Sequence, residues 1–305
     1  MARWLERREK VLDHSTYISW RLSPDSTPSS FDTDVEINSS SGRRYDFPGS
    51  RQTLSDLKCT LTSKMTRNPT IKSVPLIKIE DTSPTGYGAT QFVHALKRFI
   101  VQFRDPDVRP ADIEDWAKFV TLPFRRIPVW HKVKFVNHDL YGKETLDSVC
   151  ARPRRMCKKA NKVIQASQFD PALIQIKDTD DGNERLHDMR IGRVRVIFSF
   201  PMQDLETLFP SDMPPPPHLA YVEWYTKFSA RGDPYSGLHK VKRQISGNSP
   251  SASIIPLEKI RRSIHLFPKW GGVVPGEWSS ETVLDDCDTF WVNIFKDNIS
   301  YFNLS

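Results

Sequence analysis

The clearest hydrophobic pattern in the chain lies in the segment TQFVHALKRFIVQF, residues 90–103. Its large apolar residues follow one another in steps of three and four, which would place them in one stripe along an α-helix. They are Phe92, Val93, Leu96, Phe99, Ile100 and Phe103. Thr90 is a suitable N-cap for this helix. The pair Asp105-Pro106 should end it, because a proline disfavours the helical conformation of the residue before it.

A second, shorter helix is predicted after Pro110, with Ile113, Trp116 and Phe119 on its apolar side and Pro123 at its end. The period of the pattern then changes to two, which is typical of strands. In residues 129–138, the set Val129, His131, Val133, Phe135 alternates with Trp130, Lys132, Lys134. Further strands are predicted at Ala172–Ile176, Arg193–Phe200, Leu219–Phe228, Gly237–Val241, Ser253–Pro256, Ile264–Phe267, Phe290–Phe295 and Tyr301–Leu304.

These patterns divide the chain into four expected regions. Residues 1–20 predict an amphipathic helix that looks like the remainder of an upstream region, and residues 21–86 a flexible Ser/Thr/Pro-rich linker with one short strand at Val74–Ile79. Residues 87–189 form an α+β segment with a basic loop, and residues 190–305 a β-rich domain. The fold class is therefore α+β, ending in a small antiparallel barrel or sandwich of about seven short strands.

Composition and charge narrow the class of protein only slightly. The chain has 305 residues, 38% of them hydrophobic and 27% charged, with a formal net charge of +7. This charge permits binding to nucleic acid or to an anionic surface, and is equally typical of a solvated protein surface. The four cysteines, Cys59, Cys150, Cys157 and Cys287, lack CxxC spacing and are interpreted as reduced thiols. A charged N-terminus and the lack of a long apolar run predict no membrane segment and a nuclear or cytoplasmic location, with the nucleus favoured.

The sequence offers no recognisable catalytic motif. It lacks GxSxG, P-loop, HExxH and Rossmann patterns. The pairs Asp180-Asp181 and Asp285-Asp286 are interpreted as structural, because neighbouring residues of a strand point to opposite faces. His131 and His138 flank a strand without a nucleophile at a known offset, so they too are read as structural. We therefore expect no enzymatic activity, no metal and no cofactor.

The strongest chemical signal is the basic segment ARPRRMCKKANK, residues 151–162, which contains no acid. Six cations in such a run would neutralise a phosphate backbone, and the same run suits nuclear import or a solvated loop between strands. Smaller basic groups follow on later predicted strands, near Trp224, Tyr225, Trp270, Trp278 and Trp291. They are Arg190, Arg193 and Arg195; Lys240, Lys242 and Arg243; and Lys259, Arg261 and Arg262.

From these groups we predict a nucleic-acid-binding surface without a catalytic centre. Its expected residues are Arg152, Arg154, Arg155, Lys158, Lys159, Lys162, Lys240, Lys242, Arg243, Arg261 and Arg262. The aromatic residues would then serve as platforms for bases. The alternative at this point is that the aromatics fill the core and the cations are simply solvated.

Several segments, taken in order, resemble the C-terminal region of Plavaka-type transposases, a CACTA-related transposon family of mushroom-forming fungi. The resemblance covers most of residues 1–20 and 87–305, and its order and spacing carry it more than any single block. The segments are WLERREK (4–10), YGATQFVHALKRFI (87–100), LPFRRIPVWHKVKF (122–135), GRVRVIFSF (192–200), HLAYVEWYTKF (218–228), GLHKVKR (237–243), ASIIPLEKIRRSIHLFPKWG (252–271) and CDTFWVNIF (287–295) with Tyr301.

The resemblance implies that the catalytic acids of a ribonuclease-H-like core, and a zinc-binding segment, would lie upstream of Met1. No residue of this chain matches the acidic triad, so no catalytic position is carried over. The implied function is an accessory transposase region that binds DNA, other transposase subunits or chromatin proteins. The alternatives are a protein-interaction module that reads peptides through an aromatic groove of a small barrel, a non-functional transposase fragment, and an enzyme whose acids converge only in the folded chain.

Overall fold

The computed structural model describes residues 62–138, 144–157, 162–176, 188–229, 232–233, 236–247 and 249–293. The helix predicted in residues 1–20 and the strand predicted at Tyr301–Leu304 lie outside these ranges. Within them the chain is a mixed protein of several antiparallel sheets with short helices, which confirms the α+β class and the β-rich C-terminal part. No helix in the described ranges is long and apolar enough to cross a membrane.

The largest sheet is organised around one long strand, β10 (Met189–Phe198), which has neighbouring strands on both edges. One edge of β10 pairs with β11 (Leu219–Trp224), which in turn pairs with β15 (Ala252–Pro256). The other edge is shared: its first half pairs with β9 (Pro171–Gln175) and its last residues with β3 (Arg126–Trp130). The remaining strands are β2 (Ile71–Pro75), next to β3, and β16 (Ile260–Ser263), next to β9.

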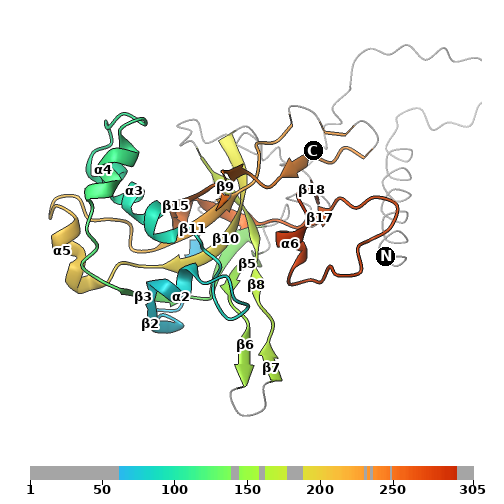
Figure 1. Ribbon diagram of the computed structural model, residues 1–305, viewed down its shortest axis with the longest axis horizontal. Coiled ribbons are helices and arrows are strands. Elements are labelled where there is room, and N and C mark those ends of the chain that lie inside the picture. Colours follow the sequence, from blue (N-terminus) through green and yellow to red (C-terminus); the bar gives the residue numbers. More distant parts are fainter. Residues whose placement is uncertain are drawn as a thin grey trace, which may run out of the picture. The chain divides into compact units, whose positions relative to one another are not determined.

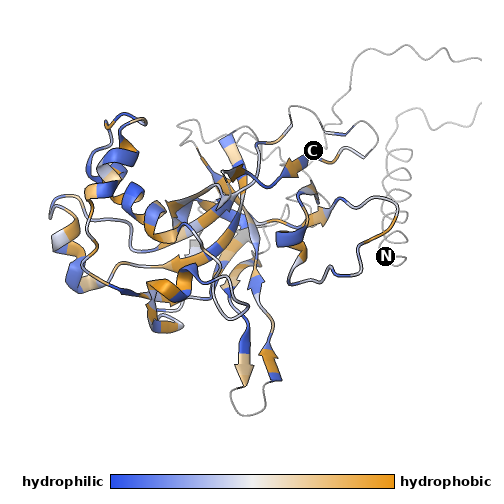
Figure 2. Ribbon diagram, in the orientation of Figure 1, coloured by the Kyte–Doolittle hydropathy of each residue, from blue (hydrophilic) through white to orange (hydrophobic). Residues whose placement is uncertain are grey.

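Nearly every residue of strand β10 is buried, on both faces of the sheet. Its sequence, MRIGRVRVIF, is therefore apolar except for its three arginines. Helix α3 (Phe92–Arg104) covers one face, and Figure 1 shows it beside β15, β11 and β10. The ring of Phe92 meets those of Phe198 and Tyr221 at centroid distances of 5.0 and 5.7 Å. Figure 2 shows the apolar colouring concentrated on these central strands. The stripe predicted from sequence is therefore the surface that closes the main core.

A second sheet and a third, smaller one complete the described part. The second consists of β1 (Thr62–Lys64), β4 (Lys132–His138), β5 (Glu144–Arg152) and β8 (Gln168–Phe169). The third consists of β12 (Lys240–Lys242), β18 (Thr289–Val292) and β17 (Leu266–Pro268), with β18 in the centre. Two short ribbons are formed by β6 (Arg155–Cys157) with β7 (Lys162–Gln165), and by β13 (Ile245–Ser246) with β14 (Ser249–Pro250).

Two helices, α3 and α4 (Ile113–Phe119), lie where the sequence pattern predicted them, although the cap of α3 differs. The remaining helices are the short α2 (Leu76–Glu80), α5 (Leu205–Leu208) and α6 (Val283–Asp286). The N-cap of α3 is Gln91 instead of Thr90, and it makes no side-chain cap bond. The carboxylate of Glu80 instead accepts a hydrogen bond from Val93 N at 3.0 Å. A distant acid thus satisfies a free backbone donor and favours the positive end of the helix.

Two expected boundaries are wrong. Residues 62–86 of the predicted linker form β1, β2 and α2, because β2 pairs with β3 and Ile79 is buried. The strand predicted at Val74–Ile79 instead spans Ile71–Pro75 and is followed directly by α2. The division between residues 189 and 190 is also not a domain boundary. It falls inside β10, and the described residues between 62 and 293 belong to one compact unit.

Gly192 of β10 leaves no room for a side chain between its neighbouring strands. A Cβ at this position would lie 2.1 Å from Val222 Cγ1 and 2.8 Å from Ile174 Cδ1. We expect Gly192→Ala to lower the free energy of unfolding by about 1–3 kcal/mol through overpacking. Urea denaturation measures this change. Gly271→Ala, where the added Cβ meets nothing within 4 Å, is the matched control. Equal midpoints for the two variants would contradict the packing described.

Candidate nucleic-acid interface

One face of the small sheet combines lysines with aromatic rings. Across its strands Lys240 lies opposite Trp291, and Trp291 lies opposite Phe267. Directly opposed residues of antiparallel strands share a face. Lys242 is opposite Thr289 in the next row, and Lys269 N donates a hydrogen bond to Thr289 O at 2.8 Å. We call Lys240, Lys242, Lys269, Phe267 and Trp291 the lysine–aromatic face.

The opposite face of the same sheet is a hydrophobic core. Val241, Phe290, Val292 and Leu266 are all buried there, at most 6% exposed. Since side chains alternate along a strand, this core fixes which residues of β12, β18 and β17 must point the other way. Phe267 and Trp291 are therefore held half-buried, while Lys242 and Lys269 are exposed.

The lysines of this face lie close enough to repel one another. The positive charge of Lys269 lowers the pKa of Lys240 from its usual value, with smaller contributions from burial and from Lys242. A lowered lysine pKa means that the charged form is disfavoured by its surroundings. A bound anion would relieve this repulsion, so the face is electrostatically suited to a polyanion.

Lys269 was missed by the sequence analysis, which found Lys240 and Lys242. Lys269 stands alone in the segment FPKWG and belongs to no basic run. The signal that could have found it is alternation, because Phe267 and Lys269 continue one face of β17 past its end. Trp270, also considered a platform, is 41% exposed beside it.

The basic segment 151–162 is divided by the fold instead of forming a single loop. Arg152 ends β5 and donates from Nη2 to Gln168 Oε1 at 2.7 Å. Arg154 forms a salt bridge with Glu281 at 2.9 Å and is only 30% exposed. Arg155 and Lys162 are exposed on the β6–β7 ribbon. Lys158 and Lys159 lie outside the described residues. The segment is divided because residues 155–157 and 162–165 pair as strands, which its basic composition does not indicate.

Three other residues predicted to contact nucleic acid make contacts within the protein; Arg243 and Arg261 are half-buried, and Arg262 is buried. Arg243 donates from Nη1 to the backbone carbonyl of Asp285. Arg261 donates to Gln175 Oε1 on β9. Arg262 is 5% exposed on β16, opposite the buried Leu173 of β9. Their charges are used for internal contacts and do not form a surface with Lys240 and Lys242.

Arg193 and Arg195 of β10 form the centre of a buried ion-pair network. Arg193 Nη1 lies 2.6 Å from Asp285 Oδ1, and Arg195 Nε lies 2.8 Å from Glu223 Oε2. Arg195 also binds Asp285 through Nη2 and lies over the ring of Phe169 at 5.1 Å. Burial alone would lower the pKa of Arg195, but Glu223 and Asp285 raise it instead. Asp285 therefore has a structural role and joins α6 to the sheet, whereas Asp286, its neighbour on the helix, is exposed.

The remaining titratable candidates are His131, His138, the pair Asp180-Asp181 and the cysteines. His131 Nε2 lies 2.9 Å from the hydroxyl of Tyr87, and burial together with the charges of Arg152 and Lys78 lowers the pKa of His131 to about 4. Within the described ranges no three His, Cys, Asp or Glu side chains group around a possible metal position. The side chain of His138 and the pair Asp180-Asp181 lie outside those ranges. Cys150 and Cys287 are free, buried thiols.

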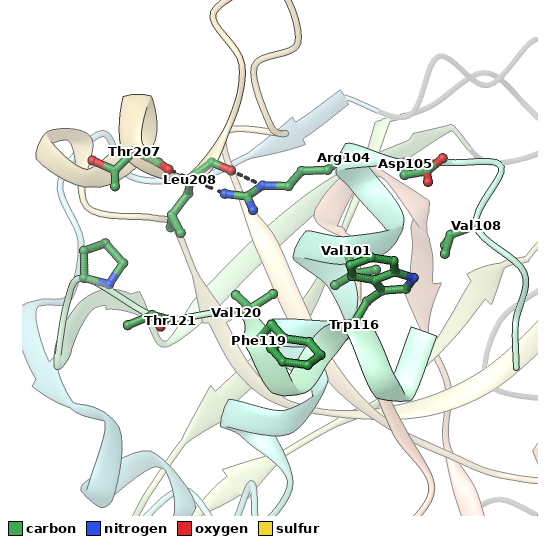
Figure 3. A pocket seen from close by; sticks show the side chains of 11 residues that line it. Val101, Arg104, Asp105, Val108, Trp116, Phe119, Val120, Thr121, Thr207 and Leu208 are labelled. Carbon is green, nitrogen blue, oxygen red and sulfur yellow. Dashed lines mark hydrogen bonds between the residues drawn. The ribbon is translucent and has the colours of Figure 1, made fainter. Parts of the chain in front are cut away.

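An apolar groove lies elsewhere in the structure, between α3, α4, the segments that follow these two helices, and α5 (Figure 3). Its volume is about 510 Å³. Trp116 and Phe119 of α4 are 58% and 80% exposed beside it. Arg104 closes one end, where its Nε donates to Leu208 O at 2.5 Å. The other lining residues are Val101, Asp105, Val108, Val120, Thr121, Pro123 and Thr207.

Comparison with known proteins adds no relative to this description. No protein-family model matches the chain. No curated protein and no solved structure is significantly similar to it. Fold and site together define an α+β protein with a cationic, aromatic sheet face, and the function must be argued from that site.

Asp285 tests the ion-pair network directly. Asp285→Ala leaves Arg193 and Arg195 without their shared carboxylate, and breaking a fully buried pair costs about 3–5 kcal/mol. Because the Asp285 side chain is 40% exposed, we expect a smaller loss in the free energy of unfolding, about 2 kcal/mol. Urea denaturation near neutral pH measures it. Asp286→Ala, an exposed neighbour on the same helix, should change stability by less than about 0.5 kcal/mol.

The pH dependence of this effect follows from the pKa of Asp285. Burial alone would raise that pKa, but Arg193 and Arg195 lower it below 3.8. A carboxyl with a lowered pKa stabilises the fold fully above its ordinary pKa and loses that contribution as the pH falls through the lowered value. The stability difference between wild type and Asp285→Ala should therefore shrink in strong acid. A difference that is constant with pH would argue against the salt bridge as its cause.

Proposed function

We propose that the protein binds nucleic acid through the lysine–aromatic face, without catalysing a reaction on it. The observation that carries this proposal is the convergence of Lys240, Lys242 and Lys269 around Trp291 and Phe267 on one side of a sheet. Lysines neutralise phosphates and release their counterions, which gives affinity without sequence preference. A half-exposed aromatic ring in the same row can stack on a base.

The arrangement favours an unpaired strand at this face. A base can stack on Trp291 only if it has left its neighbours in a duplex, so single-stranded segments bind at the lowest cost. A membrane surface would use the cations equally well, and tryptophan side chains also lie at membrane interfaces. Stacking of Trp291 on a base is the contact that distinguishes nucleic acid from other polyanions.

The resemblance to Plavaka-type transposases leads to the same class of ligand. We extend the proposal to an accessory C-terminal transposase region that holds DNA while a separate catalytic core acts on it. The ordered sequence segments support this extension, and the lysine–aromatic face supplies a physical means of holding DNA. A nuclear location would follow from such a role.

Charge reversal tests the lysine–aromatic face. For Lys240→Glu/Lys242→Glu we expect the affinity for an oligo(dT) of about 20 nucleotides to fall at least tenfold at about 50 mM salt. The slope of log K against log salt should become shallower by about 1.4, since each phosphate contact on a single strand contributes about 0.7. Fluorescence anisotropy measures both quantities.

The matched control is Lys64→Glu/Lys72→Glu, which makes the same charge change at two exposed lysines of β1 and β2. It should keep most of the affinity. Trp291→Leu should weaken binding by about 1–3 kcal/mol for the lost stacking while leaving the salt slope unchanged. If wild-type protein fails to bind at low salt, or if both double variants lose affinity equally, the proposal is wrong.

A second candidate function is protein docking in the groove beside α4. The supporting observation is the exposure of Trp116 and Phe119, two large aromatic side chains of the kind that anchor interfaces. Partners would be other transposase subunits or chromatin proteins. The module expected from sequence was an aromatic groove on a barrel, whereas this groove is formed mainly by helices.

The docking candidate predicts that Trp116→Ser/Phe119→Ser removes a partner without unfolding the protein, because neither side chain is buried. Quantitative co-purification from nuclease-treated native cells measures the loss. Ile77→Ser/Met202→Ser changes two residues that are 81% and 83% exposed outside the groove, and serves as the control. Identical partner profiles for the two variants would exclude docking at this groove.

A further inference from the structure

The β6–β7 ribbon stands apart from the sheets that surround it. Among the described strands, β6 and β7 pair only with each other. All four residues of β7 are exposed, including Val163 at 42% and Ile164 at 58%. Figure 1 shows the ribbon extending away from the other strands, and Figure 2 shows apolar colouring on β7. Two exposed β-branched residues on a projecting strand require an explanation other than packing within the chain.

The base of this ribbon is clamped by one carboxylate. Arg154, just before β6, donates to Glu281 Oε2 from Nε at 3.1 Å and from Nη2 at 2.9 Å. Ser167, just after β7, donates to the same oxygen from N at 3.1 Å and from Oγ at 2.8 Å. The residues at both ends of the ribbon are thus bound to the segment before α6. These bonds fix the direction in which the ribbon projects.

Beyond the clamp the ribbon is cationic and apolar. Arg155 and Lys162 are exposed on its two strands, and no Asp or Glu occurs from residue 151 to residue 166. Free strand edges could also add a strand from a partner protein. A run of cations without acids favours a polyanion over such a peptide, because each cation would otherwise remain uncompensated.

The dimensions of the ribbon select the form of the polyanion. Two paired strands are about 4.8 Å apart, and the major groove of B-form DNA, about 12 Å wide, admits such a ribbon with its side chains. The major groove of an RNA duplex is too deep and narrow for side chains to enter. Within the groove of DNA, apolar side chains contact the C5-methyl group of thymine.

We propose that the β6–β7 ribbon binds in the major groove of duplex DNA. Arg155 and Lys162 contact the phosphates on its rims, and Val163, on the face of the ribbon that it shares with Met156, contacts a thymine methyl group on its floor. This inference rests on the proposed nucleic-acid-binding function, because it assumes the same class of ligand. The two sites can be tested separately, because the ribbon and the lysine–aromatic face share no residue.

The test compares duplex ligands by fluorescence anisotropy. Wild-type protein should bind an AT-rich DNA duplex of about 20 base pairs at least tenfold more tightly than the RNA duplex of the same sequence. Arg155→Glu/Lys162→Glu should weaken DNA duplex binding at least tenfold and make the salt slope shallower by about 1.8, or about 0.9 for each lost contact. Arg67→Glu/Lys72→Glu, the same charge change at exposed positions elsewhere, should keep most of the affinity.

A second comparison isolates the apolar contact. Replacing thymine by uracil in the DNA duplex removes only the methyl groups, and should weaken wild-type binding severalfold while leaving Val163→Ser/Ile164→Ser unaffected. Equal affinity for DNA and RNA duplexes, or equal losses in the two charge-reversed variants, would overturn the inference. Such a result with intact binding of oligo(dT) would leave the proposed function standing. Loss of oligo(dT) binding in Arg155→Glu/Lys162→Glu, with no effect in Lys240→Glu/Lys242→Glu, would contradict the proposed function instead.

Discussion

The ion pairs between β10 and α6 are the interaction on which the candidate interface depends. Arg193 and Arg195 are less than 10% exposed, and a buried guanidinium is tolerated only with a carboxylate beside it. Glu223 supplies one from the neighbouring strand, and Asp285 supplies the other from outside the large sheet. Asp285 thereby ties α6 to β10, and α6 leads directly into β18, the central strand of the lysine–aromatic face.

A basic residue is available to a ligand only where no acid or carbonyl of the protein already binds it, so the number of cations alone does not define a binding surface. Arg154, Arg193 and Arg195 are compensated by acids, and Arg243 by a backbone carbonyl. In contrast, the lysines around Trp291 lie close to one another, and the pKa of Lys240 is lowered as a result. A formal net charge of +7 would not reveal this difference, because it counts internal and external cations alike. The proposed function rests on the second group alone.

Local periodicity predicted the parts of the fold that depend on local patterns. Helix α3 was evident from its apolar stripe, because burial of one helix face makes apolar residues recur every three or four positions. Strands β10 and β11 were evident from their dense apolar sequences. Strand β5, with the sequence ETLDSVCAR, was missed because its polar residues are stabilised by pairing with β4 and by contacts such as that of Asp147 with Ser263. Such contacts join residues more than a hundred positions apart, and no local pattern encodes them.

The candidate site was predictable to the same limited extent. Lys240 and Lys242 were found as part of a small basic group in the sequence, whereas the orientation of Arg261 and Arg262 depends on which strand β16 pairs with. The most direct test of the central claim is photo-crosslinking of the protein to an oligonucleotide that carries 5-bromodeoxyuridine, followed by mass spectrometry of the linked peptides. We expect the crosslinks to fall on the β17 and β18 peptides that contain Phe267 and Trp291. Crosslinks confined to the α4 peptide with Trp116, or none at low salt, would contradict the account.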